Sequence, residues 1–192
     1  HGLNKAVKSQ SVSGNPDGTT QSDDDFLTYA VISTNSLKAG DSTLQSVRLL
    51  VIDRTQGTGH IVSIPTDVYA EVDSNAKTLA DIYKDDGQSA FVSALASVTN
   101  IKITHVIIAT DDVWEKISSL SGSGARSLVS NASSLLSSMI TDMNPNQLLE
   151  LVEIVQPIGV SNLEHDEAPV VEGSSGTTVD ATALGKLVGM LV

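Results

Sequence analysis

Apolar positions in this chain follow two periods, one typical of strands and one typical of helices. Short runs rich in Val, Ile and Leu predict four strands. These strands cover residues 26–33, 47–53, 60–64 and 103–109. The second run is almost continuously apolar, which indicates a strand buried on both faces. A turn with Gly57 and Gly59 joins it to the third run, so the two are expected to form a hairpin.

Apolar residues spaced three and four positions apart predict helices between and after these strands. The helical segments are 77–84, 88–99, 111–120, 125–140, 145–157 and the residues that follow Asp180. Asn144, Pro145 and Gln147 stand in the order of a helix start, with a capping side chain, a first-position proline and a third-position amide. We expect a further strand at 158–163 and a loop at 172–178. Strands that interleave with helices indicate an α/β protein.

Composition divides the chain into a short leader and one domain. Residues 1–25 are rich in Ser, Gly, Asn, Asp and Thr, which predicts a flexible leader or linker. Residues 26–192 carry the periodic patterns and form the expected single domain, large enough to bury a core. The chain begins at His1, without Met, and is expected to lack its natural start.

Charge and composition restrict the function classes. The formal net charge is −12, from 23 acidic and 11 basic side chains. Such a field repels the phosphates of nucleic acids and anionic membrane surfaces, so no nucleic-acid partner is expected. Only 3% of the residues are aromatic, so the core must be built mainly from aliphatic side chains. No run reaches the ~18 apolar residues that a membrane span needs.

Two blocks of the chain resemble one known family. The run Ile61-Val62-Ser63-Ile64-Pro65-Thr66-Asp67-Val68-Tyr69 is similar to the Ser-Ile-Pro-Arg-Asp-Thr-Tyr signature of the LytR-CpsA-Psr family. Residues 140–143 (Ile-Thr-Asp-Met) and 148–151 (Leu-Leu-Glu-Leu) resemble a second family segment. The resemblance implies a three-layer α-β-α domain with a central mixed sheet flanked by helices. It also implies an extracytoplasmic domain of the bacterial cell envelope, anchored by an upstream transmembrane helix. Members of the family are phosphotransferases that move glycopolymers from lipid pyrophosphate carriers to the cell wall.

The departures from the family pattern fall on its chemistry. The signature arginine is Thr66 here, and a hydroxyl cannot grip a pyrophosphate as a guanidinium fork does. The Gly-x-Asp-x-Arg turn is replaced by residues 33–36, and the Arg-Ser-Asp-Thr motif by residues 43–46. The Arg-rich segment expected after about residue 120 is reduced to residues 121–126. Because phosphoryl transfer depends on arginine clamps and carboxylate-held metal, we expect no catalytic residues and a degenerate enzyme.

The resemblance leaves Thr66, Asp67 and Arg126 as candidate groove residues. The first hypothesis is a binding or interaction module without a cofactor, whose ligand is a polyprenyl-type lipid or an envelope protein. The alternative is a divergent phosphotransferase or pyrophosphatase that uses Asp67, Asp41 and Arg126 with Mg²⁺. A third possibility is a purely structural domain of a larger envelope assembly.

One local cluster offers metal-ligand residue types. Residues 164–167 read Glu-His-Asp-Glu, but their spacing is too local for a closed metal site, so a surface turn is expected and no metal. His60 and His105 fall in predicted strands, where a structural role is the ordinary interpretation.

Overall fold

The structure is a computed structural model that describes residues 21–191 apart from 39–40, 73, 123–124 and 159–161. Of some of these residues only the backbone is described: 72, 117–122, 125–129 and 155–157. The first twenty residues of the predicted leader lie outside the described part. Its last residues lie beside the end of the chain, where Gln21 bridges to Leu191 and the Ser22 amide donates to the Met190 carbonyl at 2.8 Å.

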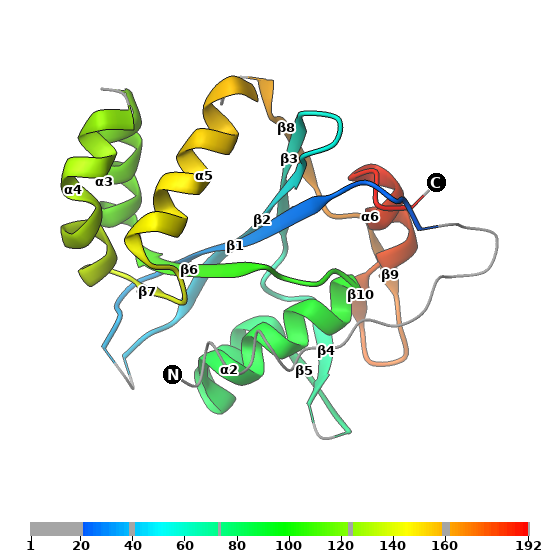
Figure 1. Cartoon of the computed structure of the whole chain (residues 1–192). Coiled ribbons are helices and arrows are strands. Elements are labelled where there is room, and N and C mark those ends of the chain that lie inside the picture. The colour runs from blue at the N-terminus through cyan, green and yellow to red at the C-terminus, as the bar shows by residue number, and fades with distance from the viewer. Residues whose placement is uncertain (1–20, 39–40, 73, 123–124, 159–161, 192) are drawn as a thin grey trace.

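A six-stranded mixed sheet lies at the centre of the domain (Figure 1). Its strands are β1 (Phe26–Thr34), β2 (Leu44–Asp53), β3 (Thr58–Ile64), β6 (His105–Thr110), β7 (Ile140–Thr141) and β8 (Glu164–Glu167). The spatial order is β7-β6-β1-β2-β3-β8. The β2–β3 hairpin is antiparallel as expected, while β1 pairs with β6 and β3 with β8 in parallel. Strands β1, β3, β6 and β8 therefore end at the same edge of the sheet.

One face of the sheet is covered by α2 and by the C-terminal elements (Figure 1). These elements are α2 (Leu79–Thr99), α6 (Ala181–Leu187), the β4–β5 hairpin (Tyr69–Val72 and Asn75–Thr78) and the β9–β10 hairpin (Val170–Glu172 and Thr177–Val179). Their core is mostly aliphatic, and it includes Leu49 and Val62 of the sheet and Leu95 of α2, each fully buried. This composition follows from the low aromatic content.

The opposite face carries the remaining helices, which lie together on the other side of the sheet in Figure 1. They are α3 (Asp111–Gly122), α4 (Ala125–Ser137) and α5 (Pro145–Ile158). Tyr29, Ile52, Leu135 and Leu148 are buried between these helices and the sheet. The three-layer α-β-α architecture with a central mixed sheet is thereby confirmed. None of the helices in the described ranges is long and apolar enough to cross a membrane.

Helix boundaries follow the local capping chemistry. The Asn144 Oδ1 accepts from the Gln147 amide and the Gln147 Oε1 accepts from the Asn144 amide, each at 2.9 Å, so the predicted capping box of α5 is confirmed. Asp180 caps α6 as predicted. The helix predicted at 77–84 begins later, because Thr78 ends β5 and accepts from the Asp81 amide. Gly87, with φ 91°, interrupts α2 where two helices were expected.

The prediction for residues 158–167 placed the strand too early in the chain. The strand lies at Glu164–Glu167, where a surface turn was expected, and 159–161 lie outside the described residues. Three acidic residues and a histidine carry no apolar alternation, so only pairing with β3 makes this segment a strand. The segment 172–178, expected to be a loop, is largely a turn between two short strands, β9 and β10.

Candidate functional site

Thr66 and Asp67 form a turn directly after β3, at the edge where the parallel strands end. The Thr66 carbonyl accepts from the Ala80 amide, and the Val68 carbonyl accepts from the Leu79 amide, both at 3.0 Å. The first turn of α2 therefore fixes the backbone of this signature run. Thr66 is half-buried and Asp67 is exposed, so the Asp67 carboxylate is open to solvent.

Arg126 lies far from this turn in the topology. It stands in the first turn of α4, on the sheet face opposite to α2, and its side chain is outside the described part of the structure. Asp41 is exposed and lies 4.0 Å from the Lys38 ammonium. Neither Thr66 nor Asp67 lines either of the two cavities described below. The groove that these two residues were expected to share with Arg126 stays a prediction.

The other two arginines are well separated. The Arg54 guanidinium lies 3.5 Å from the Asp25 carboxylate at the start of the β2–β3 turn. Arg48 lies six residues earlier, within β2, a separation of about 20 Å in extended chain. These two cations therefore cannot grip one pyrophosphate, whose charged oxygens lie within a few ångströms of one another.

A groove of about 430 Å³ lies on the face of the sheet that carries α3, α4 and α5. Strand register builds it in two rows across the sheet. One row consists of Val31, Arg48, Ser63 and Glu167, and the other contains Leu50, Ile61 and His165. Asp166 of β8 completes the lining at the sheet edge. Because side chains two positions apart share a face, neighbouring strands bring these residues to one surface. Among the described residues, α3 contacts β1 and β6 and α4 contacts β7, so these two helices cover the other end of the sheet and leave the groove open.

The groove combines an apolar floor with a polar edge. Leu50 and Ile61 are only partly buried, which leaves aliphatic surface accessible. Arg48 is exposed beside them and supplies one permanent positive charge, while Asp166 and Glu167 add carboxyl groups at the β8 edge. The volume of the groove falls within the ~300–1,000 Å³ typical of small-molecule sites. The arrangement suits an amphipathic ligand with an aliphatic body and one anionic group.

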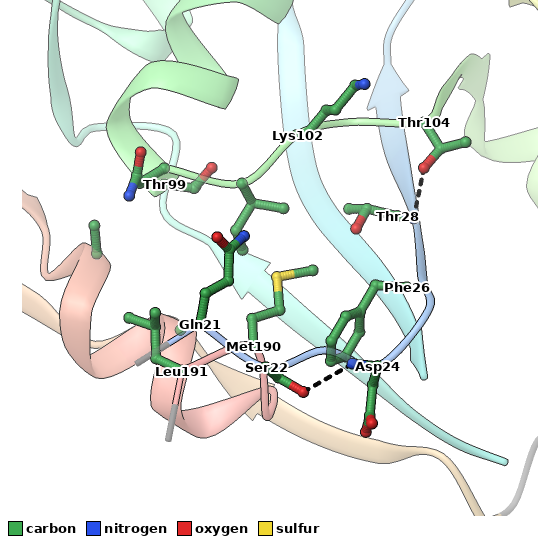
Figure 2. A pocket seen from close by; sticks show the side chains of 14 residues that line it. Gln21, Ser22, Asp24, Phe26, Thr28, Thr99, Lys102, Thr104, Met190 and Leu191 are labelled. Atoms are coloured by element: carbon green, nitrogen blue, oxygen red, sulfur yellow. Dashed lines mark hydrogen bonds between the residues drawn. The ribbon is translucent and has the colours of Figure 1, made fainter. Parts of the chain in front are cut away.

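A second cavity of about 330 Å³ lies between the start of β1, the loop after α2 and the end of α6 (Figure 2). Figure 2 shows Phe26, Met190 and Leu191 on its apolar side and Lys102 near its rim. Asp24 also lines it, and a hydrogen bond with the Asp53 carboxyl, together with burial, raises the pKa of Asp24. Its polar groups are largely hydrogen-bonded to the protein: the Ser22 hydroxyl accepts from the Asp24 amide, and the Thr104 hydroxyl from the Thr28 amide.

A third polar cluster is structural. The His105 Nδ1 lies 2.6 Å from the Asp142 carboxylate, whose other oxygen accepts from the Val106 amide at 2.8 Å. The Tyr29 ring stacks on His105 with centroids 5.7 Å apart. Each group has a partner within the fold, and the cluster joins β6 to the segment before α5. The structural role expected for His105 is consistent with this geometry.

Sequence reasoning missed the groove for a physical reason. Arg48 is the one polar residue among residues 47–52, so the run predicted a strand buried on both faces rather than one with an open face. No pattern in residues 164–167 shows that His165 and Glu167 join the same surface, because that depends on their pairing with β3.

Comparisons with known proteins agree on the fold. No protein-family model matches the chain, and no curated protein matches it. A solved transcriptional regulator, yvhJ from Bacillus subtilis, is 15% identical, with a TM-score of 0.64 over 86% of this chain and 95% of that one. TagV of B. subtilis is 12% identical, with a TM-score of 0.65 over 86% and 95%. TagT bound to LI-WTA is 11% identical, with a TM-score of 0.55 over 93% and 95%. TagV and TagT are LytR-CpsA-Psr proteins, so the family resemblance is confirmed at the level of the fold.

Proposed function

Since the chain has the LytR-CpsA-Psr fold, we propose that it is a non-catalytic binding module of the bacterial cell envelope. Its ligand is a polyprenyl-type lipid, and its site is the open groove on β2, β3 and β8. The observation that carries this proposal is the alignment of Leu50 and Ile61 with Arg48 on one sheet surface that stays partly open in the described part of the chain. In the full-length protein the domain is extracytoplasmic and joined to a membrane anchor.

The charge distribution supports binding without turnover. Cleaving a lipid pyrophosphate requires several cations around one diphosphate. Thr66 replaces the signature arginine, and Arg54 is paired with Asp25 far from Arg48. Losing one such donor costs ~2.7–4 kcal/mol of barrier, and several are missing here. A single guanidinium at the groove suffices to pair with one phosphate.

Shape supports a lipid over an envelope protein as the ligand. A concave surface of about 430 Å³ matches a chain-like small molecule, whereas protein interfaces are broad and rather flat. One of the structural neighbours, TagT, was solved bound to LI-WTA. That neighbour makes an envelope ligand the first class to test.

Binding of farnesyl phosphate, a short water-soluble polyprenyl phosphate, tests the proposal by calorimetry. Ile61→Asp places a charge on the groove floor and is expected to weaken binding at least tenfold, because an aliphatic chain cannot cover an unpaired carboxylate. Val171→Asp is the matched control, since Val171 is 48% exposed and belongs to β9. Equal affinity of the two variants, or no binding by the parent chain, would refute a lipid site in the groove.

A turnover assay separates the proposal from the enzyme alternative. Farnesyl pyrophosphate is incubated with the chain and Mg²⁺, and released phosphate is measured. We expect no release above background in the parent chain or in Asp67→Ala. Metal-dependent release that Asp67→Ala abolishes would establish a phosphotransferase or pyrophosphatase instead.

A further inference from the structure

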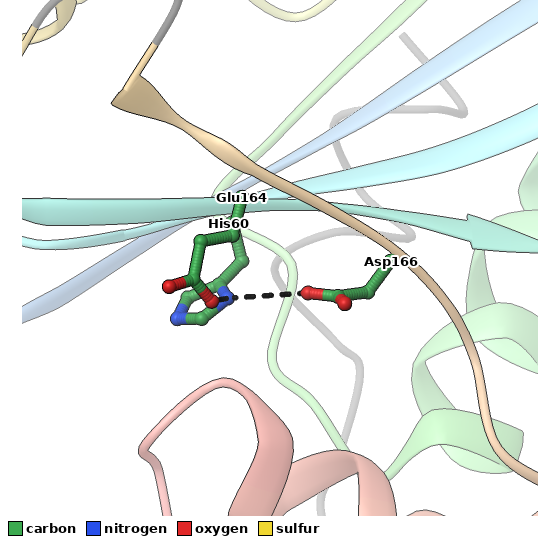
Figure 3. A group of neighbouring side chains, drawn as sticks. All are labelled: His60, Glu164 and Asp166. Atoms are coloured by element: carbon green, nitrogen blue, oxygen red, sulfur yellow. Dashed lines mark ion pairs between the residues drawn. The ribbon is translucent and has the colours of Figure 1, made fainter.

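The edge of the sheet holds a second group of chemistry-bearing side chains, on the face opposite to the groove. In the parallel pairing of β3 with β8, His60 stands opposite Glu164, and Val62 stands opposite Asp166. Glu164 and Asp166 are two residues apart and so share a face of β8. That face carries the buried Val62 side chain, and Figure 3 shows the two carboxylates turned toward the His60 ring.

Three potential ligand atoms converge at this point. The His60 Nδ1 lies 3.3 Å from the Glu164 Oε2 and 3.6 Å from the Asp166 Oδ2, and all three atoms lie within 4.8 Å of one another. The His60 Nδ1 and the Asp166 Oδ2 are buried, and neither has a hydrogen-bond partner within the described part of the chain. Buried polar atoms without partners are rare in folded proteins, so this pair calls for a physical explanation.

The distances from the His60 Nδ1 to the two carboxylate oxygens match the spacing of ligands around a common ion better than the length of a hydrogen bond. Charge-assisted N–H···O bonds measure about 2.7–2.9 Å. In a tetrahedral zinc site with bonds of about 2.0–2.1 Å, neighbouring ligand atoms stand roughly 3.3–3.4 Å apart. The two nitrogen-to-oxygen distances here fall at or slightly above the second value.

Charge favours a divalent cation in the same place. Two carboxylates beside a neutral imidazole carry two negative charges, and a proton on the ring would balance only one of them. The imidazole belongs to the ligands that suit zinc and its neighbours, whereas Mg²⁺ and Ca²⁺ prefer oxygen alone. Three protein ligands also leave one position of a tetrahedral ion for water.

The geometry points to a divalent transition-metal site of the zinc class formed by His60, Glu164 and Asp166. The ion ties the edge strand β8 to β3, because its ligands come from both strands. The ligand side chains lie on the face of the sheet opposite to the lipid groove, and Asp166 also contributes to the lining of that groove. Glu164, with 70% of its side chain exposed, is the ligand that can move onto an entering ion.

Calorimetric titration of the chain with Zn²⁺, after treatment with a chelator and its removal, tests the site. One ion per chain is expected. Glu164→Gln and His60→Gln remove ligands and are expected to weaken zinc binding at least about 100-fold. Glu167→Gln and His165→Gln are matched controls, because they make the same changes on the opposite face of β8 and should leave the affinity within twofold.

Thermal unfolding supplies a second readout that does not depend on calorimetric heat. At a Zn²⁺ concentration of about 100 times Kd, the parent chain should gain about 5–10 °C in Tm, because the ion binds only the folded state. Glu164→Gln lies on the surface and should fold, so it stays informative if His60→Gln does not. Absence of zinc binding by the parent chain would mean that His60, Glu164 and Asp166 form only ion pairs. Loss of zinc binding in His165→Gln would mean that the ion binds at a different site. Either result overturns the proposal.

Discussion

Both faces of strand β8 carry acidic side chains, and the two faces differ in what those side chains meet. On one face, Glu164 and Asp166 converge with His60 from β3, and two buried polar atoms stay without a hydrogen bond. On the other face, His165 and Glu167 line an open groove with aliphatic neighbours. The difference lies in the neighbouring strand, which places a histidine on one face and an isoleucine and a serine on the other. Chemistry at a sheet edge is therefore decided by cross-strand partners rather than by the strand's own composition.

The largest expected contrast between the faces is in packing. Leu49 and Leu50 are adjacent in β2, and Leu49 is fully buried toward α2 whereas Leu50 is partly open at the groove. Leu49→Ala should lower the free energy of unfolding by about 2–5 kcal/mol. Leu50→Ala should cost about 1 kcal/mol, because less apolar area is lost from contact. Urea denaturation of both variants measures the difference, and equal costs would mean that the groove is closed in solution.

Tyr29 lies on the same sheet face as the groove, in the part that the helices cover, and allows the burial of that part to be tested. Burial, reinforced by the Glu150 carboxylate, raises the pKa of Tyr29 to about 12 from 10.0. The unfolded chain therefore loses this proton first, so stability from Tyr29 is complete below pH 10 and is lost as the pH rises to 12. The loss should be about 2 kcal/mol, and Tyr29→Phe should remove it. Denaturation of both chains across this pH range checks the sign, and identical pH profiles would contradict the burial of Tyr29.

The helix that covers part of this face depends on its cap. Asn144→Ala removes the acceptor for the Gln147 amide and should cost about 1 kcal/mol of stability. Asn144→Asp keeps an acceptor at the same place and serves as the control. Thermal melts of the two variants give the measurement, and equal losses would show that the capping box contributes little to docking α5.

The smallest expected effect compares the two faces of β8 directly, in the absence of metal. With a chelator present, Glu164→Gln should raise stability by a few tenths of a kcal/mol, because it relieves repulsion with Asp166. Glu167→Gln lines the groove and should change stability less. Careful denaturant titrations resolve the pair, and a destabilised Glu164→Gln would indicate that the carboxylate pairs with a protonated His60.

Much of the fold could be read from the residues in advance, and the site could not. The strand at 47–53 and the capping residues Asn144 and Asp180 carry local signals that the structure confirms. The expected burial of this strand on both faces was wrong at Arg48 and Leu50, which face the groove. The polar strand at 164–167 carries none, so its place was assigned to a turn. Thr66 and Asp67 stay beside the start of α2, and their groove role is still a prediction.

Apolar periodicity and side-chain caps are properties of neighbouring residues, and they were enough to establish the α/β class, the central hairpin and most of the helices. The pairing of β8 with β3 joins residues about a hundred positions apart, and no local pattern encodes it. That pairing alone decides which face each charged side chain of β8 occupies, because a shift of one residue would exchange the two sets. Both the groove and the candidate metal site exist only through this register.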